Sequence, residues 1–476
     1  MSFLRHTVQS AGAGLIMTLS RFMAMAIIAR TLGVESFGLL TFSVFCIDLI
    51  ALLALAGLPG ATARFSTLAS LDERPGLARM LAIWLLVACI VSMLAAPLVA
   101  IWVIELGSDG VLLFTGWSIL AVVQTAGAAK LQGAMRFDLI TWANAAGAFA
   151  IVVGALVLVR PEEPLTAFTV LAITITIQAL PVVLLWLGIA KPAPPRSDRP
   201  GLPERREMLV YGANVWLTSL TTAIVWGRGE ILVIEAMLDE RALGIYGAAM
   251  TLMAMVWRMT QMLQGAVAPH LSRKLQAPGD EFETFVAGIT RLTLAISTCS
   301  ALVLAWGGRE LAILVFGVEF ARSGEILAII APGAAVAGVG TVNLATQYLS
   351  NGRFNRNAVV VAAAVLLGLA CLLILWADAL GAGLARAIVL MGLAIAMPLW
   401  MIGAGYAKLS IGVIYELLGA VLLVICASLT VLILAPDIWI KAVSCFVMAY
   451  LVLGRATGSF VPWHMVRGGV RALRAL

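Results

Sequence analysis

The segment MTLSRFMAMAIIARTLG, from Met17 to Gly33, is the apolar body of a helix that one arginine, Arg21, interrupts. A run of about 20 apolar residues can cross a hydrocarbon layer about 30 Å thick as an α-helix. A charged side chain at that depth costs about 2.5 to 3.5 kcal/mol on insertion scales unless it faces a partner or a wet cavity. The segment therefore predicts a membrane span, and Arg21 needs a physical explanation.

Apolar blocks of this length recur along the whole chain. The 476 residues are 62% hydrophobic and 12% charged, whereas soluble domains hold roughly 45 to 50% apolar residues. We expect an all-α polytopic membrane protein with about fourteen transmembrane helices. The predicted spans are residues 12–30, 38–58, 78–104, 111–130, 139–159, 165–189, 209–236, 242–267, 287–306, 325–349, 358–376, 382–403, 411–435 and 438–458.

The positions of the basic residues predict the orientation. With the N-terminus inside, roughly 19 Lys and Arg fall in cytoplasmic segments, roughly 6 outside and roughly 6 within spans, as the positive-inside rule expects. The strongest contribution is the polar loop AKPAPPRSDRPGLPERRE, Ala190 to Glu207. Both termini are therefore expected in the cytoplasm.

A weak internal repeat coincides with this loop. ARTLGVESFGLLTF, Ala29 to Phe42, and AMLDERALGIYGAA, Ala236 to Ala249, each combine a helix end, a short polar turn and a new apolar run. The offset of about 206 residues places Arg21 one residue from alignment with Arg228. We predict two six-helix lobes, as in transporters, and a C-terminal pair of helices. The expected parts are 1–205 with the central loop, 206–405, and 406–476 with a basic tail.

Catalytic motifs are missing from the sequence. There is no HExxH, GxxxxGK[ST] or GxSxG pattern and no DxD carboxylate cluster. The three histidines offer no ligand set, and the six cysteines lie singly in apolar blocks. We therefore expect no enzyme activity, no metal site and no cofactor.

Two charges at membrane depth fall in the first two predicted spans. Arg21 lies near the middle of the first and Asp48 near the middle of the second, which is expected to run antiparallel to it. One interpretation is that the two side chains neutralise each other and lock the helices together. The other is that Arg21 projects into a central cavity as an anion site, and that Asp48 either tunes this site or exchanges with the anion for Arg21.

A second group of charges centres on WGRGE, Trp226 to Glu230. Its two glycines weaken the helix where the side chain of Arg228 must leave it. Arg228 and Glu230 cannot face each other at a spacing of two residues, so Arg258 in the next span is a candidate partner for Glu230 or a further cavity cation. Glu230 itself is either a structural partner or a proton or cation site. We expect Arg291 and Arg386, near span ends, to snorkel to the interface.

These charges leave an excess of cations at membrane depth. Such an excess suits an anionic group such as a phosphate or diphosphate, which guanidinium groups bind in a bidentate manner. A pump that exports cations would more naturally show an excess of acids.

Several short motifs, in order along the chain, carry a resemblance to a known family. They are ARTLGVESFGLLTF (Ala29–Phe42), RGEILVIEAMLDERALGIYGAA (Arg228–Ala249), GAVAPHLSRKLQ (Gly265–Gln276), ELAILVFGVEFARSGEILAII (Glu310–Ile330) and ATQYLSNGRFNR (Ala345–Arg356). Over essentially its whole length the chain resembles the polysaccharide flippases, of the O-antigen type, within the multidrug, oligosaccharidyl-lipid and polysaccharide exporter superfamily. The first span of that family often lacks a charge at this point. With Arg21, the first span of this chain resembles instead that of the related lipid II flippases, which carries basic residues.

The resemblance implies two lobes around a central cavity that opens alternately to either side. Its expected cargo is a polyprenyl-diphosphate-linked oligosaccharide, a repeat unit of O-antigen, capsule or exopolysaccharide, moved across the bacterial inner membrane. Arg21, Arg228 and Arg258 can supply the cavity cations that characterise such flippases. Expected partners are membrane lipids and other polysaccharide assembly proteins, with no role for nucleic acid. The alternatives are a lipid II flippase and a multidrug exporter coupled to a proton or sodium gradient through Asp48 or Glu230.

Overall fold

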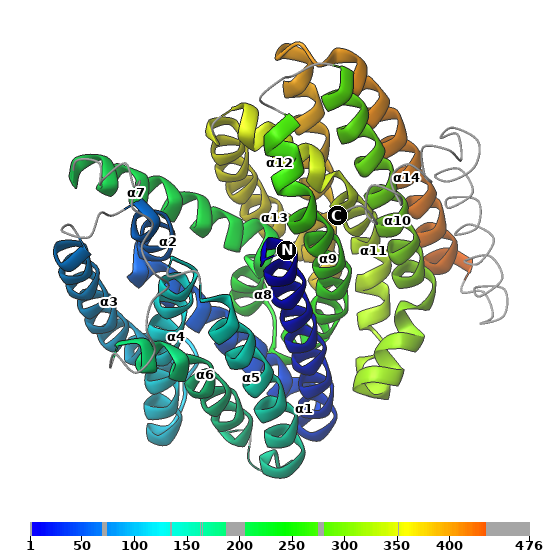
Figure 1. Ribbon diagram of the computed structural model, residues 1–476. Helices are drawn as coiled ribbons and strands as arrows, with labels where there is room; N and C mark the ends of the chain where they lie inside the picture. The colour runs from blue at the N-terminus through cyan, green and yellow to red at the C-terminus, as the bar shows by residue number, and fades with distance from the viewer. Residues whose placement is uncertain are drawn as a thin grey trace. The chain divides into compact units, whose positions relative to one another are not determined.

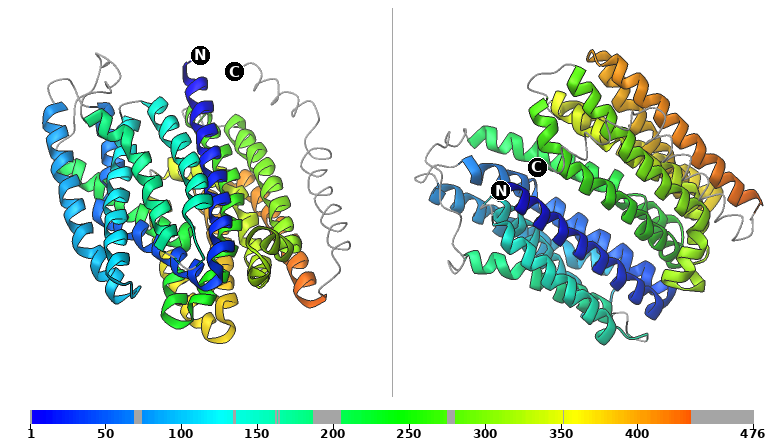
Figure 2. Two further views of the ribbon diagram at one scale, coloured as in Figure 1. Left: turned by 90° about the horizontal axis from the view of Figure 1, so that it is seen from below. Right: turned by 45° about the vertical axis from the view of Figure 1, so that its right-hand side comes forward.

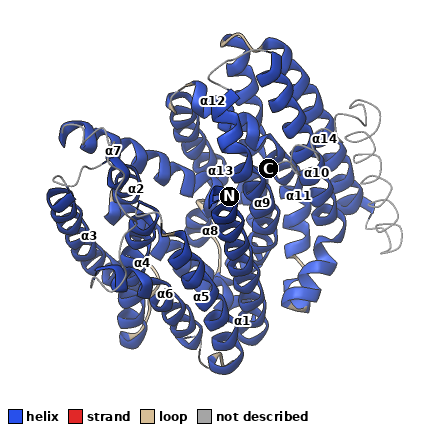
Figure 3. Cartoon of the chain, viewed as in Figure 1, coloured by secondary structure: helices blue, strands red, loops and turns tan. Residues whose placement is uncertain are grey.

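The computed structural model describes residues 2–68, 74–133, 136–161, 163, 165–186, 205–274, 280–350 and 352–434. Within these ranges the regular elements are all helices, apart from one isolated bridge between Arg160 and Glu163 (Figure 1, Figure 3). The prediction of an all-α protein is confirmed. The last predicted span, residues 438–458, lies outside the described residues, as do the basic tail and most of the central loop.

The helices follow the predicted spans closely. They are α1 (Ser2–Leu55), α2 (Leu58–Leu68), α3 (Arg74–Trp102), α4 (Ser108–Gly133), α5 (Phe137–Leu158), α6 (Leu165–Trp186), α7 (Arg205–Thr222), a π-helix (Ala223–Arg228), α8 (Ile231–Met237), α9 (Glu240–Lys274), α10 (Asp280–Phe316), a 3-10 helix (Val318–Phe320), α11 (Ser323–Ala335), a second 3-10 helix (Val336–Val339), α12 (Gly340–Leu349), α13 (Arg353–Gly403) and α14 (Ala407–Leu434). The first thirteen predicted spans all coincide with helical segments.

Two of the long helices each cover two predicted spans. α1 breaks at Gly33, whose φ of 78° favours glycine, and α13 breaks at Ala377 and Asp378. In the described part of the chain, nine helical segments are long and apolar enough to cross a membrane. The chain is therefore a multi-span membrane protein.

The chain divides into two compact units, Met1–Gly227 and Arg228–Leu476. In unit 1, α1 packs against α4 and α5, α3 against α4, and α6 against both α4 and α5. These helices, coloured blue to green, run side by side (Figure 2). In unit 2, α10 packs against α9, α11 and α14, and α13 packs against α11 and α12. The boundary between the units falls inside the predicted span 209–236, and the three-part division made from the sequence stays a prediction.

α7 belongs to unit 1 because it lies against the turn between α1 and α2. Gly57 in that turn has a φ of 85°, and a Cβ placed on it would lie 2.0 Å from the carbonyl oxygen of Gly212. Trp216 Nε1 donates a hydrogen bond to the carbonyl oxygen of Leu52 across 3.1 Å. The backbones approach this closely because Gly57 carries no side chain.

Small residues and hydroxyl groups hold the core of unit 2 together. A Cβ on Gly338 would lie 2.3 Å from the Cα of Leu294. Thr293 and Ser297 on α10 donate hydrogen bonds to the carbonyl oxygens of Gly338 and Ala335, at 2.6 and 2.7 Å. Close packing and interhelical hydrogen bonds are what stabilise helix contacts in lipid, where the hydrophobic effect between helices is lost.

Candidate functional site

The predicted span 209–236 is interrupted near its middle. α7 passes into the π-helix Ala223–Arg228, Gly227 leaves helical geometry with φ −78° and ψ −120°, and α8 begins at Ile231. The sequence prediction that the glycines of WGRGE weaken the helix at Arg228 is confirmed. π-helical turns and glycines are established causes of such breaks.

Glu230 lies at this break and is completely buried. Its Oε1 accepts a hydrogen bond from Arg386 Nη1 at 2.6 Å, and it accepts a second, short hydrogen bond from the hydroxyl of Tyr246. Arg386 is 1% exposed. The three side chains come from the start of α8, from α9 and from the second half of α13, so the ion pair joins three helices of unit 2.

The expectation that Arg386 snorkels to the interface was wrong. The structure buries the whole side chain eight residues beyond the break at Asp378, about 12 Å along the helix. Its neighbours on α13 include buried Gly383, Ala382 and Ala387. Such small residues let other helices approach and enclose the guanidinium. Arg386, rather than Arg258, is therefore the ionic partner of Glu230.

Arg228 is half-buried and turns toward α9. Its Nη2 donates a hydrogen bond to Thr251 Oγ1 at 3.2 Å, while the Thr251 hydroxyl donates to the carbonyl oxygen of Gly247 at 2.8 Å. Arg258 is exposed and lies seven residues after Thr251, which is two turns along the same helix face and about 10 Å further on. Arg258 Nη1 is 3.5 Å from Gln261 Oε1 on that face. The structure thus brings Arg228 and Arg258 to one side of α9.

The two predicted charges of unit 1 lie on the two halves of α1. Arg21 is exposed, although Met17, Ala24 and Ile28, which share its helix face, are buried. Arg21 is therefore an exposed position on a helix face whose neighbouring residues are buried. Within the described residues, no ion pair joins it to Asp48.

Asp48 lines a cavity of about 390 Å³ within unit 1, which we call the Asp48 cavity. Its remaining polar lining consists of four hydroxyl side chains, one on α4 and three on α7. They are Thr125, Thr218, Ser219 and Thr222, and the aliphatic lining is Ala51, Leu52, Leu55, Pro59 and Ala223. Sequence reasoning missed these hydroxyls, because their shared position depends on how α4 and α7 pack against α1.

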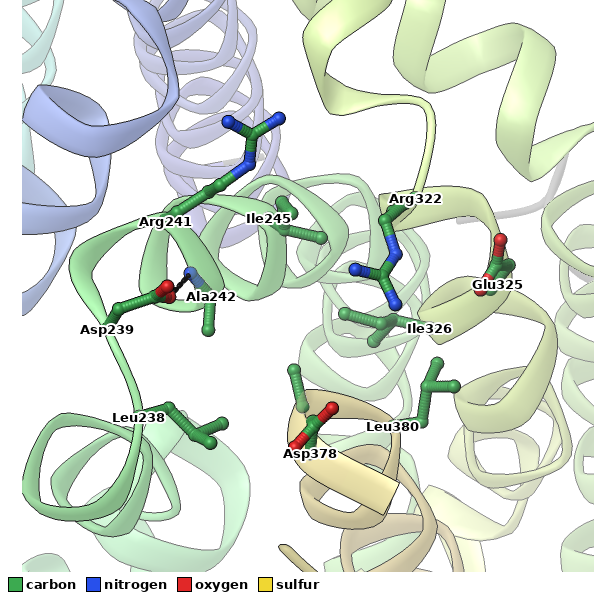
Figure 4. A pocket seen from close by; sticks show the side chains of 11 residues that line it. Leu238, Asp239, Arg241, Ala242, Ile245, Arg322, Glu325, Ile326, Asp378 and Leu380 are labelled. Atoms are coloured by element: carbon green, nitrogen blue, oxygen red, sulfur yellow. Dashed lines mark hydrogen bonds between the residues drawn. The ribbon is translucent and has the colours of Figure 1, made fainter.

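A second cavity, of about 270 Å³, lies within unit 2 (Figure 4). Its lining residues come from three places: the turn between α8 and α9, the start of α11, and the break in α13. Its charged residues are Asp239, Arg241, Arg322, Glu325 and Asp378. Asp239 Oδ1 accepts a hydrogen bond from the amide of Ala242 and so caps α9. Among the described residues, no three His, Cys, Asp or Glu side chains gather as a metal ion would require.

The fold is similar to the folds of solved membrane transporters and of a flippase. It is similar to the lipid II flippase MurJ in an inward closed conformation, with a TM-score of 0.66 and 12% identity over 94% of this chain and 98% of that one. It is also similar to a multidrug resistance MATE family transporter of the MOP superfamily. The inward-facing form of that transporter gives a TM-score of 0.65 and 15% identity over 82% of this chain and 96% of that one. The outward-facing form of the MATE transporter gives a TM-score of 0.59 and 15% identity over 85% of this chain and 96% of that one.

The sequence match is more specific than the fold. The family described as polysaccharide biosynthesis protein matches residues 3–274, more than half of the chain. The chain belongs to this family, and the predicted membership is confirmed. No curated protein sequence matches the chain. The structures similar to it are of transporters and a flippase, at identities that speak for the fold alone.

Proposed function

We propose that the protein is a flippase that carries a polyprenyl-diphosphate-linked oligosaccharide from the cytoplasmic to the outer leaflet of the bacterial inner membrane. The family supports a role in polysaccharide biosynthesis, and the fold similarity to a lipid II flippase supports a cargo of this chemical kind. O-antigen, capsule and exopolysaccharide repeat units all share the diphosphate. We propose that the protein works by alternating access rather than as an enzyme, with both termini in the cytoplasm.

One observation carries the assignment of the diphosphate site. Arg386 Nη1 donates a hydrogen bond to Glu230 Oε1 at 2.6 Å. The charge of Glu230, the acid nearest to Arg228 in sequence, is therefore already neutralised by Arg386. Arg228 and Arg258 both contribute positive charge on one side of α9. A diphosphate carries several acceptor oxygens that guanidinium groups bind well, and Arg228 reaches α9 at Thr251, two helical turns before Arg258. The predicted role of Arg21, in unit 1, as a substrate-binding cation stays a separate prediction.

The experiment that tests this measures glycan export in cells that carry Arg228→Ala, Arg228→Lys, Arg258→Ala or Arg21→Ala as the only copy. We expect Arg228→Ala to reduce export at least about tenfold and to make lipid-linked intermediates accumulate, because one lost bidentate contact to an anion is worth about 1.5 to 3 kcal/mol. Arg228→Lys keeps the charge and should retain more export. Arg160→Ala, which removes an exposed arginine between α5 and α6 that lines neither cavity, is the control. Full export by Arg228→Ala at normal protein level would rule out the site.

A multidrug exporter is the second candidate, because the fold is about as similar to a MATE family transporter as to the flippase. Resistance to cationic dyes on expression, lost when the ion gradient is dissipated, would favour it. Either a flippase or a multidrug exporter can be driven by a proton or sodium gradient. Glu230 is poorly suited to bind the coupling ion, since the guanidinium of Arg386 already holds its carboxylate.

A further inference from the structure

Two hydroxyl groups of α7 depart from the usual behaviour of hydroxyl side chains in helices. Serine and threonine within a helix commonly donate to the carbonyl oxygen one turn earlier. Thr218 and Thr221 do so, to Asn214 and Leu217 at 2.9 and 2.8 Å. Ser219 and Thr222 are half-buried and line the Asp48 cavity, and neither donates to an acceptor in the described part of the chain.

The polar lining of the Asp48 cavity selects among classes of ligand. A carboxylate accepts hydrogen bonds only, whereas each hydroxyl both donates and accepts. Among the lining residues there is no Arg, Lys or His that would hold a phosphate, and Asp48 would repel one. There is also no aromatic ring among them, so of these side chains only the Asp48 carboxylate would attract a lipophilic cation.

The cavity is larger than a simple ion cage requires. Oxygen ligands surround a bound calcium ion at about 2.3 to 2.6 Å, whereas this cavity has a volume of about 390 Å³. That volume lies within the range of about 300 to 1,000 Å³ typical of sites for small organic molecules. Sugar hydroxyls, which donate and accept in turn, match the lining.

We propose that the Asp48 cavity binds a sugar residue of the lipid-linked glycan. Ser219 and Thr222 donate to and accept from sugar hydroxyls, and the Asp48 carboxylate accepts from a further one. Leu52, Leu55 and Pro59 provide the aliphatic wall against which the ring packs. The inference rests on the proposed function and deepens it, because it names the part of the substrate that the Asp48 cavity binds.

The test compares two probes on the purified full-length protein in nanodiscs. One probe is the mixture of lipid-linked intermediates that accumulates in cells depleted of this protein, quantified by its diphosphate content. The other is bare polyprenyl diphosphate of the same chain length. Dissociation constants are measured for the unaltered protein, for Ser219→Ala with Thr222→Val, for Asp48→Asn and for Arg228→Ala. Thr221→Val is the matched control, because its hydroxyl already bonds to its own helix and does not line the cavity.

We expect the unaltered protein and the control to prefer the glycan-linked probe. The double variant should bind the glycan-linked probe about 2- to 10-fold more weakly for each lost hydroxyl, and its affinity for the bare diphosphate should not change. Arg228→Ala should lower the affinity for both probes. A double variant that keeps the preference would overturn the sugar site and leave the proposed function standing. Sodium-dependent binding that disappears in Asp48→Asn would overturn it in favour of a cation site. If neither probe binds to the unaltered protein, the proposed function fails as well.

Discussion

Arg386 Nη1 lies 2.6 Å from Glu230 Oε1, and both side chains are buried within unit 2. Tyr246 donates a second hydrogen bond to the same oxygen. This arrangement separates the roles of neighbouring charges in WGRGE: Glu230 is held by the fold, while Arg228 is bonded to a threonine hydroxyl and is half-buried. A residue with a structural role and a residue proposed to bind substrate thus lie only two positions apart.

Removing one partner of the buried ion pair should destabilise the protein strongly. We expect Glu230→Leu or Arg386→Met to cost about 3 to 5 kcal/mol, because each leaves an uncompensated buried charge. The paired substitution Glu230→Leu with Arg386→Met should cost less than the sum. Arg291→Ala is the control, since Arg291 and Glu416 are 3.9 Å apart and partly exposed, and such pairs contribute about 0 to 1 kcal/mol. Midpoints of thermal unfolding in detergent measure the effect, and additive costs in the double variant would contradict it.

Thr251 should matter for transport because it positions Arg228. Its hydroxyl proton is given to Gly247, so its lone pair remains to accept from the guanidinium. We expect Thr251→Val to lower export by about 3- to 10-fold at normal protein level, since a misplaced binding group loses part of its contact energy. Thr260→Val on the same helix is the control, because the Thr260 hydroxyl bonds to the carbonyl oxygen of Trp257. Equal export rates for the two variants would remove the positioning role of Thr251.

Arg21 should be accessible from water although its helix face is packed. In a background without cysteine, Arg21→Cys should react with a small hydrophilic thiol reagent at least about tenfold faster than Met17→Cys or Ala24→Cys, because thiol reactivity follows exposure. The prediction depends on the contrast between exposed Arg21 and its buried neighbours. If all three cysteines react slowly, there is no water-filled opening at Arg21.

The contact between Gly57 and Gly212 should tolerate no side chain. A Cβ on Gly57 would overlap the backbone of Gly212, and the φ of 85° adds strain for any other residue. We expect Gly57→Ala to lower the yield of folded protein sharply. Gly116→Ala should instead be neutral or stabilising by up to about 1 kcal/mol, because Gly116 lies in α4 with open space around it. Fluorescence-detected size exclusion of both variants measures the difference, and equal yields would contradict the expected clash.

The sequence predicted the helices well because apolar length is a local property. The thirteen spans that fall on described residues all coincide with helices, and the break at Arg228 followed from its flanking glycines. The partner of Glu230 could not be predicted, because Arg386 lies 156 residues away and several arginines were equally available. One local signal was present: in GAGLARA, Gly381 to Ala387, small residues surround the arginine, which indicates close helix packing rather than a position near the interface.

Placing the start of the predicted span at residue 382 also contributed to that error. The helix runs on from the break at Asp378, which puts Arg386 a full two turns inside rather than near an end. The polar lining of the Asp48 cavity was missed for a related reason. Nothing in the sequence of their own helices distinguishes Thr125 and Thr222 from other threonines. They line a common cavity only because α4 and α7 both pack against α1.

The separation of Glu230 and Arg386 along the chain also sets an order for biosynthesis. At about 5 to 20 residues per second, the ribosome needs between about 8 and 31 s to add the 156 residues that separate the two. During that time the membrane segment that contains Glu230 lies in the bilayer, and its carboxylate has not yet paired with the guanidinium of Arg386. The second half of the protein therefore cannot acquire its final packing until the helix of Arg386 enters the membrane. A nascent chain stalled before Arg386 should remain sensitive to protease in unit 2, and resistance at that stage would show that another group serves as a temporary partner.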